Sequence, residues 1–177
     1  MSRSSAARRN VELKAIDPDP ERSLRVCREL GAADHGVIHQ RDTYFNAVHG
    51  VLKLREDPAA VAQLIHYERD DRTEQRLSRY RIVEVPDGET LRAALGTALG
   101  VRGVVEKRRH LWLWDQVRIH LDDVSSLGHF IEFEAVAPAE SDLSEQHRRV
   151  AELRVAFEID DDRLCPTGYA TLSAFAT

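Results

Sequence analysis

Residues 10–15 have the sequence Asn-Val-Glu-Leu-Lys-Ala, in which polar side chains at even positions alternate with apolar side chains at odd positions. Because successive side chains of a β-strand point to opposite faces, this period of two predicts a strand over residues 9–16. The segment Asp17-Pro18-Asp19-Pro20 then ends the strand, because proline lacks the backbone N–H that pairing requires. The first element of the chain is therefore a strand with one apolar and one charged face.

Seven further segments of strand character follow along the chain, with short turns between most of them. They are residues 42–47, 51–56, 61–69, 79–85, 103–113, 116–122 and 129–136. Helical spacing of apolar residues predicts helices at about 20–30, 89–99, 144–157 and 167–175. Short turns between successive strands favour antiparallel pairing. The predicted fold class is α+β, with an antiparallel sheet that is either large and curved or closed into a barrel.

Length and composition restrict the class of protein. A chain of 177 residues, 42% hydrophobic and 31% charged, fits a flexible N-terminal tail (1–8) followed by a single domain (9–177). No apolar run approaches the roughly 20 residues of a membrane helix, so no membrane partner is expected. The net charge of −5 argues against nucleic acid as the main partner. Two distant cysteines, Cys27 and Cys165, fit a cytoplasmic protein with reduced thiols.

The polar faces of the predicted strands are unusual because they carry charges two residues apart, again and again. The sets are Glu12 with Lys14, Lys53 with Arg55, Lys107 with Arg109, Arg118 with His120 and Asp122, and Glu132 with Glu134. Such a face either meets water with ion pairs between strands or lines the inside of a closed barrel. In the second case, carboxylates would hold a divalent cation and Lys and Arg would hold phosphate oxygens. This combination suits a polyphosphate that carries a metal ion.

Several segments in order resemble the CYTH family, which includes class IV adenylate cyclases and thiamine triphosphatases among the triphosphate tunnel metalloenzymes. The segments are Asn10-x-Glu12-x-Lys14, Asp42-Thr43-Tyr44-Phe45, Leu52-Lys53-Leu54-Arg55, Val105-x-Lys107-Arg108-Arg109, Val117-Arg118-Ile119-His120-Leu121-Asp122 and Leu127-Gly128-x-Phe130-x-Glu132-x-Glu134. The resemblance extends over about residues 9–172. It implies an eight-stranded antiparallel β-barrel, surrounded by helices, whose tunnel binds a triphosphate with Mg²⁺ or Mn²⁺.

Carried over by position, the resemblance also implies roles for individual residues. Glu12, Glu132 and Glu134 would be metal ligands, with Asp122 as a further ligand or water-holder, and Lys14 would join the three glutamates in catalysis. The phosphate-binding residues would be Lys14, Lys53, Arg55, Arg69, Arg79, Lys107, Arg109 and Arg118, with Arg81 as an alternative to Arg79. We expect Tyr44 and Tyr67 to pack rather than to touch a substrate, and His120 to line the tunnel with a structural hydrogen bond.

The sequence departs from the family pattern at three places. Asn10 stands where the family carries its first acid, which makes a second metal less secure. The loop at Glu68-Arg69-Asp70-Asp71 is acidic, and the segment from Cys165 to Thr177 contains no Lys or Arg, which argues against thiamine triphosphate as the substrate.

Three functions remain open on these residues. The first is hydrolysis of a nucleoside, organic or inorganic triphosphate. The second is cyclisation of ATP to cyclic AMP and pyrophosphate, and the third is binding of a polyphosphate or nucleotide without turnover. The helix at 144–157 packs either within the chain or at the interface of a homodimer.

Overall fold

The computed structural model describes residues 8–69, 75–165, 168 and 169, with only the backbone at Arg69 and Arg76. Its strands are β1 (Arg8–Ile16), β2 (Ala33–Phe45), β3 (Val51–Asp57), β4 (Ala60–Arg69), β5 (Arg76–Val85), β6 (Val101–Trp114), β7 (Val117–Val124) and β8 (Gly128–Ala137). They close in the order β1-β5-β4-β3-β2-β6-β7-β8, and every neighbouring pair is antiparallel. The prediction of an eight-stranded antiparallel barrel in an α+β fold is confirmed.

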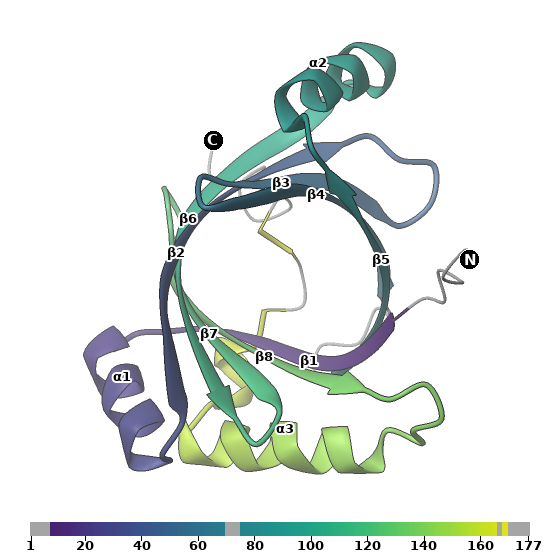
Figure 1. The fold of residues 1–177 in the computed structure, drawn as a ribbon. Helices are drawn as coiled ribbons and strands as arrows, with labels where there is room; N and C mark the ends of the chain where they lie inside the picture. The colour runs from purple at the N-terminus through teal and green to yellow at the C-terminus, as the bar shows by residue number, and fades with distance from the viewer. Residues whose placement is uncertain (1–7, 70–74, 166–167, 170–177) are drawn as a thin grey trace.

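The helices lie outside the barrel on two sides (Figure 1). They are α1 (Pro20–Glu29), α2 (Gly88–Leu99) and α3 (Ser144–Ala156), followed by a 3₁₀ turn at Asp161–Arg163. In the end-on view, α1 and α3 lie beside β7, β8 and β1, whereas α2 lies beyond β3 and β4. None of the helices among the described residues is long and apolar enough to cross a membrane.

Strand boundaries differ from the prediction mainly in β2, which starts at Ala33 rather than near residue 42. Residues 33–39 are almost all exposed, and the register shifts between Asp34 and Val37. Alternation is absent there because neither face of this part of the strand is buried. β1 begins at Arg8, within the segment predicted as a tail, and residues 1–7 lie outside the described part of the chain. The helix predicted at 167–175 also falls almost entirely outside it.

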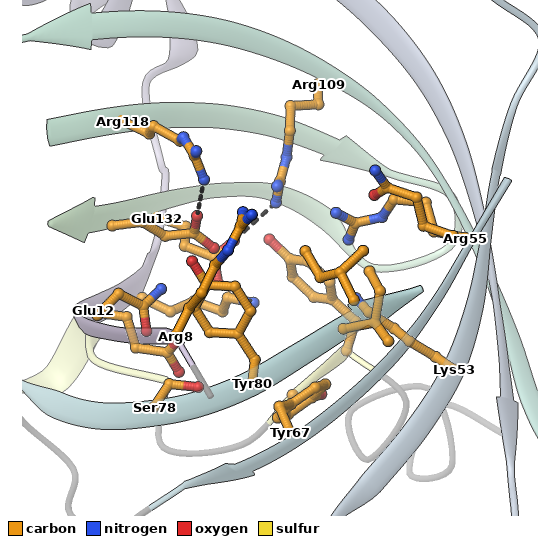
Figure 2. A pocket seen from close by; sticks show the side chains of 18 of the residues that line it. Arg8, Glu12, Lys53, Arg55, Tyr67, Ser78, Tyr80, Arg109, Arg118 and Glu132 are labelled. Atoms are coloured by element: carbon orange, nitrogen blue, oxygen red, sulfur yellow. Dashed lines mark hydrogen bonds and ion pairs between the residues drawn. The ribbon is translucent and has the colours of Figure 1, made fainter. Parts of the chain in front are cut away.

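The charged faces of the strands point inward. Register places Lys14 opposite Glu132, His120 opposite Glu132, Arg109 opposite Asp122 and Asp42 opposite Arg55. Directly opposite side chains project to the same face of a sheet, and Figure 2 shows Arg55, Arg109 and Glu132 pointing into the interior of the barrel. Of the two interpretations of the charged faces, the lined interior is therefore the one that the fold realises.

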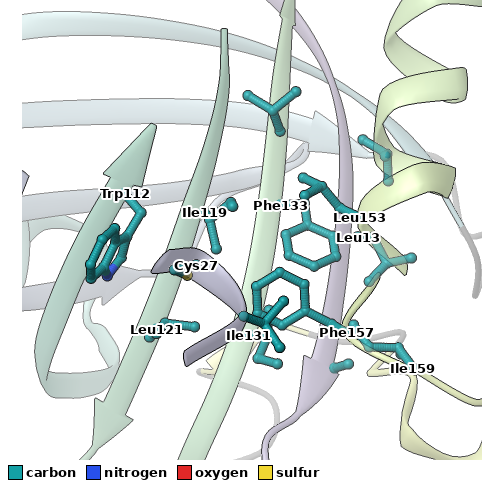
Figure 3. Close-up of a cluster of buried hydrophobic side chains, with 14 of the residues drawn as sticks. Leu13, Cys27, Trp112, Ile119, Leu121, Ile131, Phe133, Leu153, Phe157 and Ile159 are labelled. Atoms are coloured by element: carbon teal, nitrogen blue, oxygen red, sulfur yellow. The ribbon is translucent and has the colours of Figure 1, made fainter. Parts of the chain in front are cut away.

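The main hydrophobic core lies outside the barrel wall, between the sheet and the helices (Figure 3). Leu13 and Phe133 point outward from β1 and β8 and pack with Leu153 of α3 and with Phe157, all at 0% exposure. The rings of Phe133 and Phe157 are 5.2 Å apart between centroids. Burying the apolar faces outside frees the inner faces for charged side chains, which a conventional barrel core would exclude.

Candidate active site

A cavity of about 340 Å³ occupies the interior of the barrel. The strands supply most of the lining, and the C-terminal segment supplies Gly168 and Tyr169. The residues from the strands are Arg8, Asn10, Glu12, Lys14, Tyr44, Lys53, Arg55, Gln63, Ile65, Tyr67, Ser78, Tyr80, Ile82, Lys107, Arg109, Arg118, Glu132 and Glu134. Asp42, His120 and Asp122 lie directly behind this lining, in contact with it. The cavity is thus lined by both cations and carboxylates, as in the second interpretation of the charged faces.

One wall of the cavity carries the acids. Glu132 and Glu134 on β8 lie beside His120 on β7, and one ligand atom from each of the three falls within 4.8 Å of the other two. Glu12 on β1 is 3% exposed and directly opposite Glu134. The structure therefore brings together three of the predicted metal ligands, Glu12, Glu132 and Glu134, and adds a histidine next to two of them.

Two cations hold the carboxylate of Glu132. Lys14 Nζ lies 2.9 Å from its Oε1, and Arg109 Nη2 lies 2.7 Å from its Oε2. Burial on its own would raise the pKa of Glu132, but Lys14, the contact from His120 and Arg109 outweigh burial and hold that pKa well below its usual range. The carboxylate is therefore fully ionised at neutral pH and available to a cation.

The opposite wall carries the bases, which are organised around Asp42 of β2. This carboxylate is 0% exposed; its Oδ2 lies 2.8 Å from Lys53 Nζ, its Oδ1 2.8 Å from Arg55 Nε, and Lys107 Nζ approaches to 3.8 Å. Three charges on one carboxylate outweigh its burial and hold the pKa of Asp42 well below its usual range. Burial and the nearby Arg55 lower the pKa of Lys53 to about 8, and burial and Arg109 hold that of Lys107 well below its usual range.

Asp122 does not belong to the acidic group in the structure. Arg109 donates to both of its oxygens at 2.6 Å, and the hydroxyl of Tyr169 donates to Oδ2 at 2.7 Å. This bidentate pair fixes the guanidinium of Arg109 so that the same Nη2 also reaches Glu132. Asp122 therefore acts here as an anchor for a base rather than as an open ligand, in contrast to the role that the resemblance implied.

The remaining predicted bases are distributed unevenly. Arg118 lies at the rim, with its side chain 47% exposed and Nη1 3.5 Å from Glu134. Arg79 is exposed, and its neighbours Ser78 and Tyr80 line the cavity instead, which places Arg79 on the outer face of β5. The side chain of Arg69 lies outside the described part of the structure. Lys14, Lys53, Arg55, Lys107 and Arg109 all meet in the cavity, as predicted.

Several lining residues were not among the predicted site residues. Arg8 falls within the predicted tail. Asp42, directly behind the lining, was not predicted either, although it projects to the same face of its strand as Tyr44 and alternation could have identified it. Tyr169 arrives from the C-terminal segment and places its ring 3.6 Å from Lys14 Nζ, a contact that no local pattern announces. Tyr44 and Tyr67 are buried as packing residues, yet they also line the cavity, with Lys53 Nζ 5.5 and 5.8 Å from their rings.

The donor set fits a divalent cation. Carboxylate oxygens of Glu132 and Glu134 and a ring nitrogen of His120 converge within the span of one ion. In addition, Asn10 is 4% exposed, lines the same cavity, and its Oδ1 has no hydrogen-bond partner among the residues that the structure describes. A buried amide oxygen without a partner is costly, and a bound ion or its water shell would relieve that cost.

Comparison with known proteins bears on this geometry. A family model described as "CYTH domain" matches residues 8–165, and no curated protein matches the chain. Among solved structures, the PH1012 protein of Pyrococcus horikoshii OT3 superposes with a TM-score of 0.81 at 23% identity, covering 92% of this chain and 98% of that one.

Two more distant structures carry names that mention an activity. A protein of Vibrio parahaemolyticus provisionally named an adenylate cyclase has a TM-score of 0.77 at 18% identity over 93% of this chain and 97% of its own. HpAC1 of Hippeastrum, described as having a dominant triphosphatase activity, has a TM-score of 0.59 at 14% identity over 95% and 94%. At these identities, the likeness concerns the fold.

Proposed function

The chain belongs to the CYTH domain family, and on that premise we propose that it hydrolyses a triphosphate-containing small molecule with the help of Mg²⁺ or Mn²⁺. The substrate would be a nucleoside, organic or inorganic triphosphate bound inside the barrel. Glu132 and Glu134, together with Glu12, would hold the cation. Lys14, Lys53, Arg55, Lys107, Arg109 and the rim residues Arg8 and Arg118 would hold the phosphate oxygens.

A single observation carries this proposal: three carboxylates, those of Glu12, Glu132 and Glu134, line the same cavity as seven basic side chains. A site for a free metal ion needs only acids, and a site for a free anion needs only bases. A polyphosphate with a bound divalent cation presents both signs at once and satisfies both walls. The excess of basic over acidic side chains in the cavity also explains how a chain with a net charge of −5 can bind an anion, because the local field rather than the total charge decides.

The mechanism requires positioning and charge neutralisation from the protein rather than covalent chemistry. Asp42 and Asp122 fix Lys53, Arg55 and Arg109 in place before the substrate arrives, so little reorganisation remains for the reaction. The cation, when bound, would draw negative charge from the phosphate oxygens and orient a water molecule. Lys14 and Arg109, which contact Glu132 in the structure, would turn toward phosphate oxygens once a cation neutralises that carboxylate.

The test is a product assay. ATP, GTP, thiamine triphosphate and tripolyphosphate would be incubated separately with the protein and Mg²⁺ or Mn²⁺, and orthophosphate, pyrophosphate and cyclic nucleotide would be measured together. We expect orthophosphate, and a loss of at least about 100-fold in turnover for Glu134→Gln, with Glu152→Gln on the surface of α3 as the matched control. Pyrophosphate with an equal amount of cyclic nucleotide would make the protein a cyclase instead. Saturable binding without any product would make it a binding domain.

A further inference from the structure

We propose that His120 supplies a nitrogen ligand to the cation at Glu132 and Glu134, so that the site prefers a divalent transition metal such as Mn²⁺ or Co²⁺ over Mg²⁺. This inference rests on the part of the proposed function that places a cation in the cavity. It concerns the identity of that cation and a ligand for which the motifs predicted only a structural hydrogen bond.

The position of His120 relative to the glutamates carries the first step. His120 is directly opposite Glu132, and the next inward-facing pair of the same two strands is Arg118 opposite Glu134. One atom from each of His120, Glu132 and Glu134 lies within 4.8 Å of the others. Metal–ligand bonds of about 2.0–2.2 Å separate the ligands of one ion by roughly 3–4 Å, so a small adjustment of side chains completes the group.

The contact between the imidazole and Glu132 is loose for a hydrogen bond. Nδ1 lies 3.4 Å from Oε2, whereas the common distance is about 2.9 Å. Meanwhile Arg109 already donates to the same oxygen at 2.7 Å. A histidine that served only to hold this carboxylate would be redundant here, although it is only 3% exposed. The extra separation leaves room for an ion between the ring and the carboxylate.

Asn10 adds a polar side chain to the same cavity, opposite Val136 and thus two residues along β8 from Glu134. On β1, Glu12 lies opposite Glu134, and Asn10 is the next inward-facing residue of that strand. Its Oδ1 is buried and lacks a hydrogen-bond partner within the described residues. An oxygen in that state can coordinate an ion directly or accept from a metal-bound water. The described residues therefore offer one nitrogen, from His120 directly behind the cavity lining, beside the carboxylate oxygens of Glu132 and Glu134.

The nitrogen decides the choice of metal. Mg²⁺ takes oxygen ligands almost exclusively and keeps several waters, whereas imidazole is a favourable ligand for transition metals. A set of one imidazole and two carboxylates therefore binds Mn²⁺ or Co²⁺ more tightly than Mg²⁺. If His120 were replaced by an oxygen donor of similar reach, that preference would shrink. His120→Asn makes this replacement, because the amide oxygen can occupy a position near that of Nδ1.

The test observes ligation itself. The full-length protein would be loaded with Mn²⁺ alone, and pulsed EPR would detect the coupling of the metal to ¹⁴N, with a second sample labelled with ¹⁵N only at histidine. We expect a directly bound histidine nitrogen whose signal changes with the isotope and disappears in His120→Asn. His35→Asn, on the exposed part of β2, is the matched control and should keep the signal.

Calorimetric titration with Mn²⁺ and with Mg²⁺ gives the second measurement. We expect His120→Asn to weaken Mn²⁺ binding by at least about 10-fold and Mg²⁺ binding by less than about threefold. A wild-type Mn²⁺ spectrum without histidine coupling would overturn the proposal, as would an unchanged ratio of the two affinities in His120→Asn. The isotope comparison uses wild-type protein, so it decides even if the variant folds poorly. Neither measurement requires turnover. A protein that hydrolyses nothing can therefore still show ligation by His120, and an active enzyme can still lack it.

Discussion

Replacement of Asp42 by asparagine is the sharpest test of how the basic wall is built. The substitution keeps the shape of the side chain and removes one negative charge from a position with 0% exposure. Lys53 and Arg55 then lose the carboxylate that they contact at 2.8 Å, and Lys107 loses one at 3.8 Å. Buried charges that lose their partner are strongly unfavourable, because the protein interior solvates them poorly.

The magnitude follows from the contacts. Breaking a buried ion pair by removing one partner costs about 3–5 kcal/mol. The amide oxygen of asparagine can still accept one hydrogen bond from Arg55, so we expect a loss near the lower end, about 3 kcal/mol in the free energy of unfolding. For a domain of this size, about 2–4 °C per kcal/mol translates this into a fall of roughly 6–12 °C in Tm. An added polyanion should restore part of the loss, because it supplies the missing negative charge.

The assay is thermal unfolding at about pH 6.5, which is below the pKa of about 8 of Lys53, with and without tripolyphosphate. We expect Asp42→Asn to melt lower than wild type and to gain more from tripolyphosphate than wild type does. Asp115→Asn is the control, because Asp115 pairs with Arg149 at the surface and its side chain is 54% exposed. Loss of that pair should cost less than about 1 kcal/mol. If the Tm of Asp42→Asn matched that of Asp115→Asn and rose no more with tripolyphosphate, Asp42 would not be the counter-charge of Lys53 and Arg55.

Three further predictions concern pH, the rim of the cavity and the core. The pKa of Lys53 is about 8 in the folded protein, below its unfolded value of 10.5, so its contribution to stability should increase from about pH 8 to 9 while the affinity for tripolyphosphate falls. Melting and calorimetry over that range measure the two trends, and stability and affinity that changed in the same direction would contradict the lowered pKa of Lys53. Arg8→Ala should raise KM about tenfold, because it removes a charge-assisted contact of about 1.5 kcal/mol. Arg79→Ala on the outer face should leave KM unchanged, and equal changes of KM in the two variants would refute the register of β1 with β5. Leu153→Ala should lower the free energy of unfolding by about 2–5 kcal/mol. Calorimetry should find its tripolyphosphate affinity unchanged, because the side chain of Leu153 packs outside the barrel wall, and a weakened affinity would show that the core and the cavity are coupled.

Alternation predicted the strands because it is a local property, whereas the closed barrel was implied by the resemblance to the CYTH family. Over residues 10–15 of β1 and 131–135 of β8, charged or polar residues alternate with apolar ones, so both the strands and their charged faces could be identified. β5 is different, because Arg79 and Arg81 are charged while the inward positions hold Ser78, Tyr80 and Ile82. Charge alone therefore pointed to the wrong face there. Exposure on both faces hid the first part of β2 in the same way.

Roles within the site depend on register between strands, which no single strand reveals. His120 and Asp122 share one face of β7, and the aspartate seemed the better metal ligand from its chemistry alone. Pairing places Asp122 opposite Arg109, which occupies both of its oxygens, and places His120 opposite Glu132. A shift of one pair would have exchanged their surroundings. The pairing of the strands therefore decides that Asp122 holds a base while His120 lies beside the metal-binding glutamates.

Strand pairing also explains why the bases inside the barrel do not all form ion pairs with the acids that would bind the metal. Asp42 and Asp122 each have 0% exposed side chains and bind their partners through short contacts, so they neutralise the bases from behind. Glu132 and Glu134 face the cavity from the other wall, and Glu134 is the more accessible of the two, with 20% of its side chain exposed. Had one pair of acids served both purposes, a cation and the arginines would compete for the same oxygens. Separate anchoring acids remove part of that competition. It persists at Glu134, which Arg118 contacts at 3.5 Å, and at Glu132, where Lys14 and Arg109 must yield when a cation binds. Binding of metal and polyphosphate should therefore be mutually favourable at this residue, because each ligand relieves the charge that the other leaves unpaired.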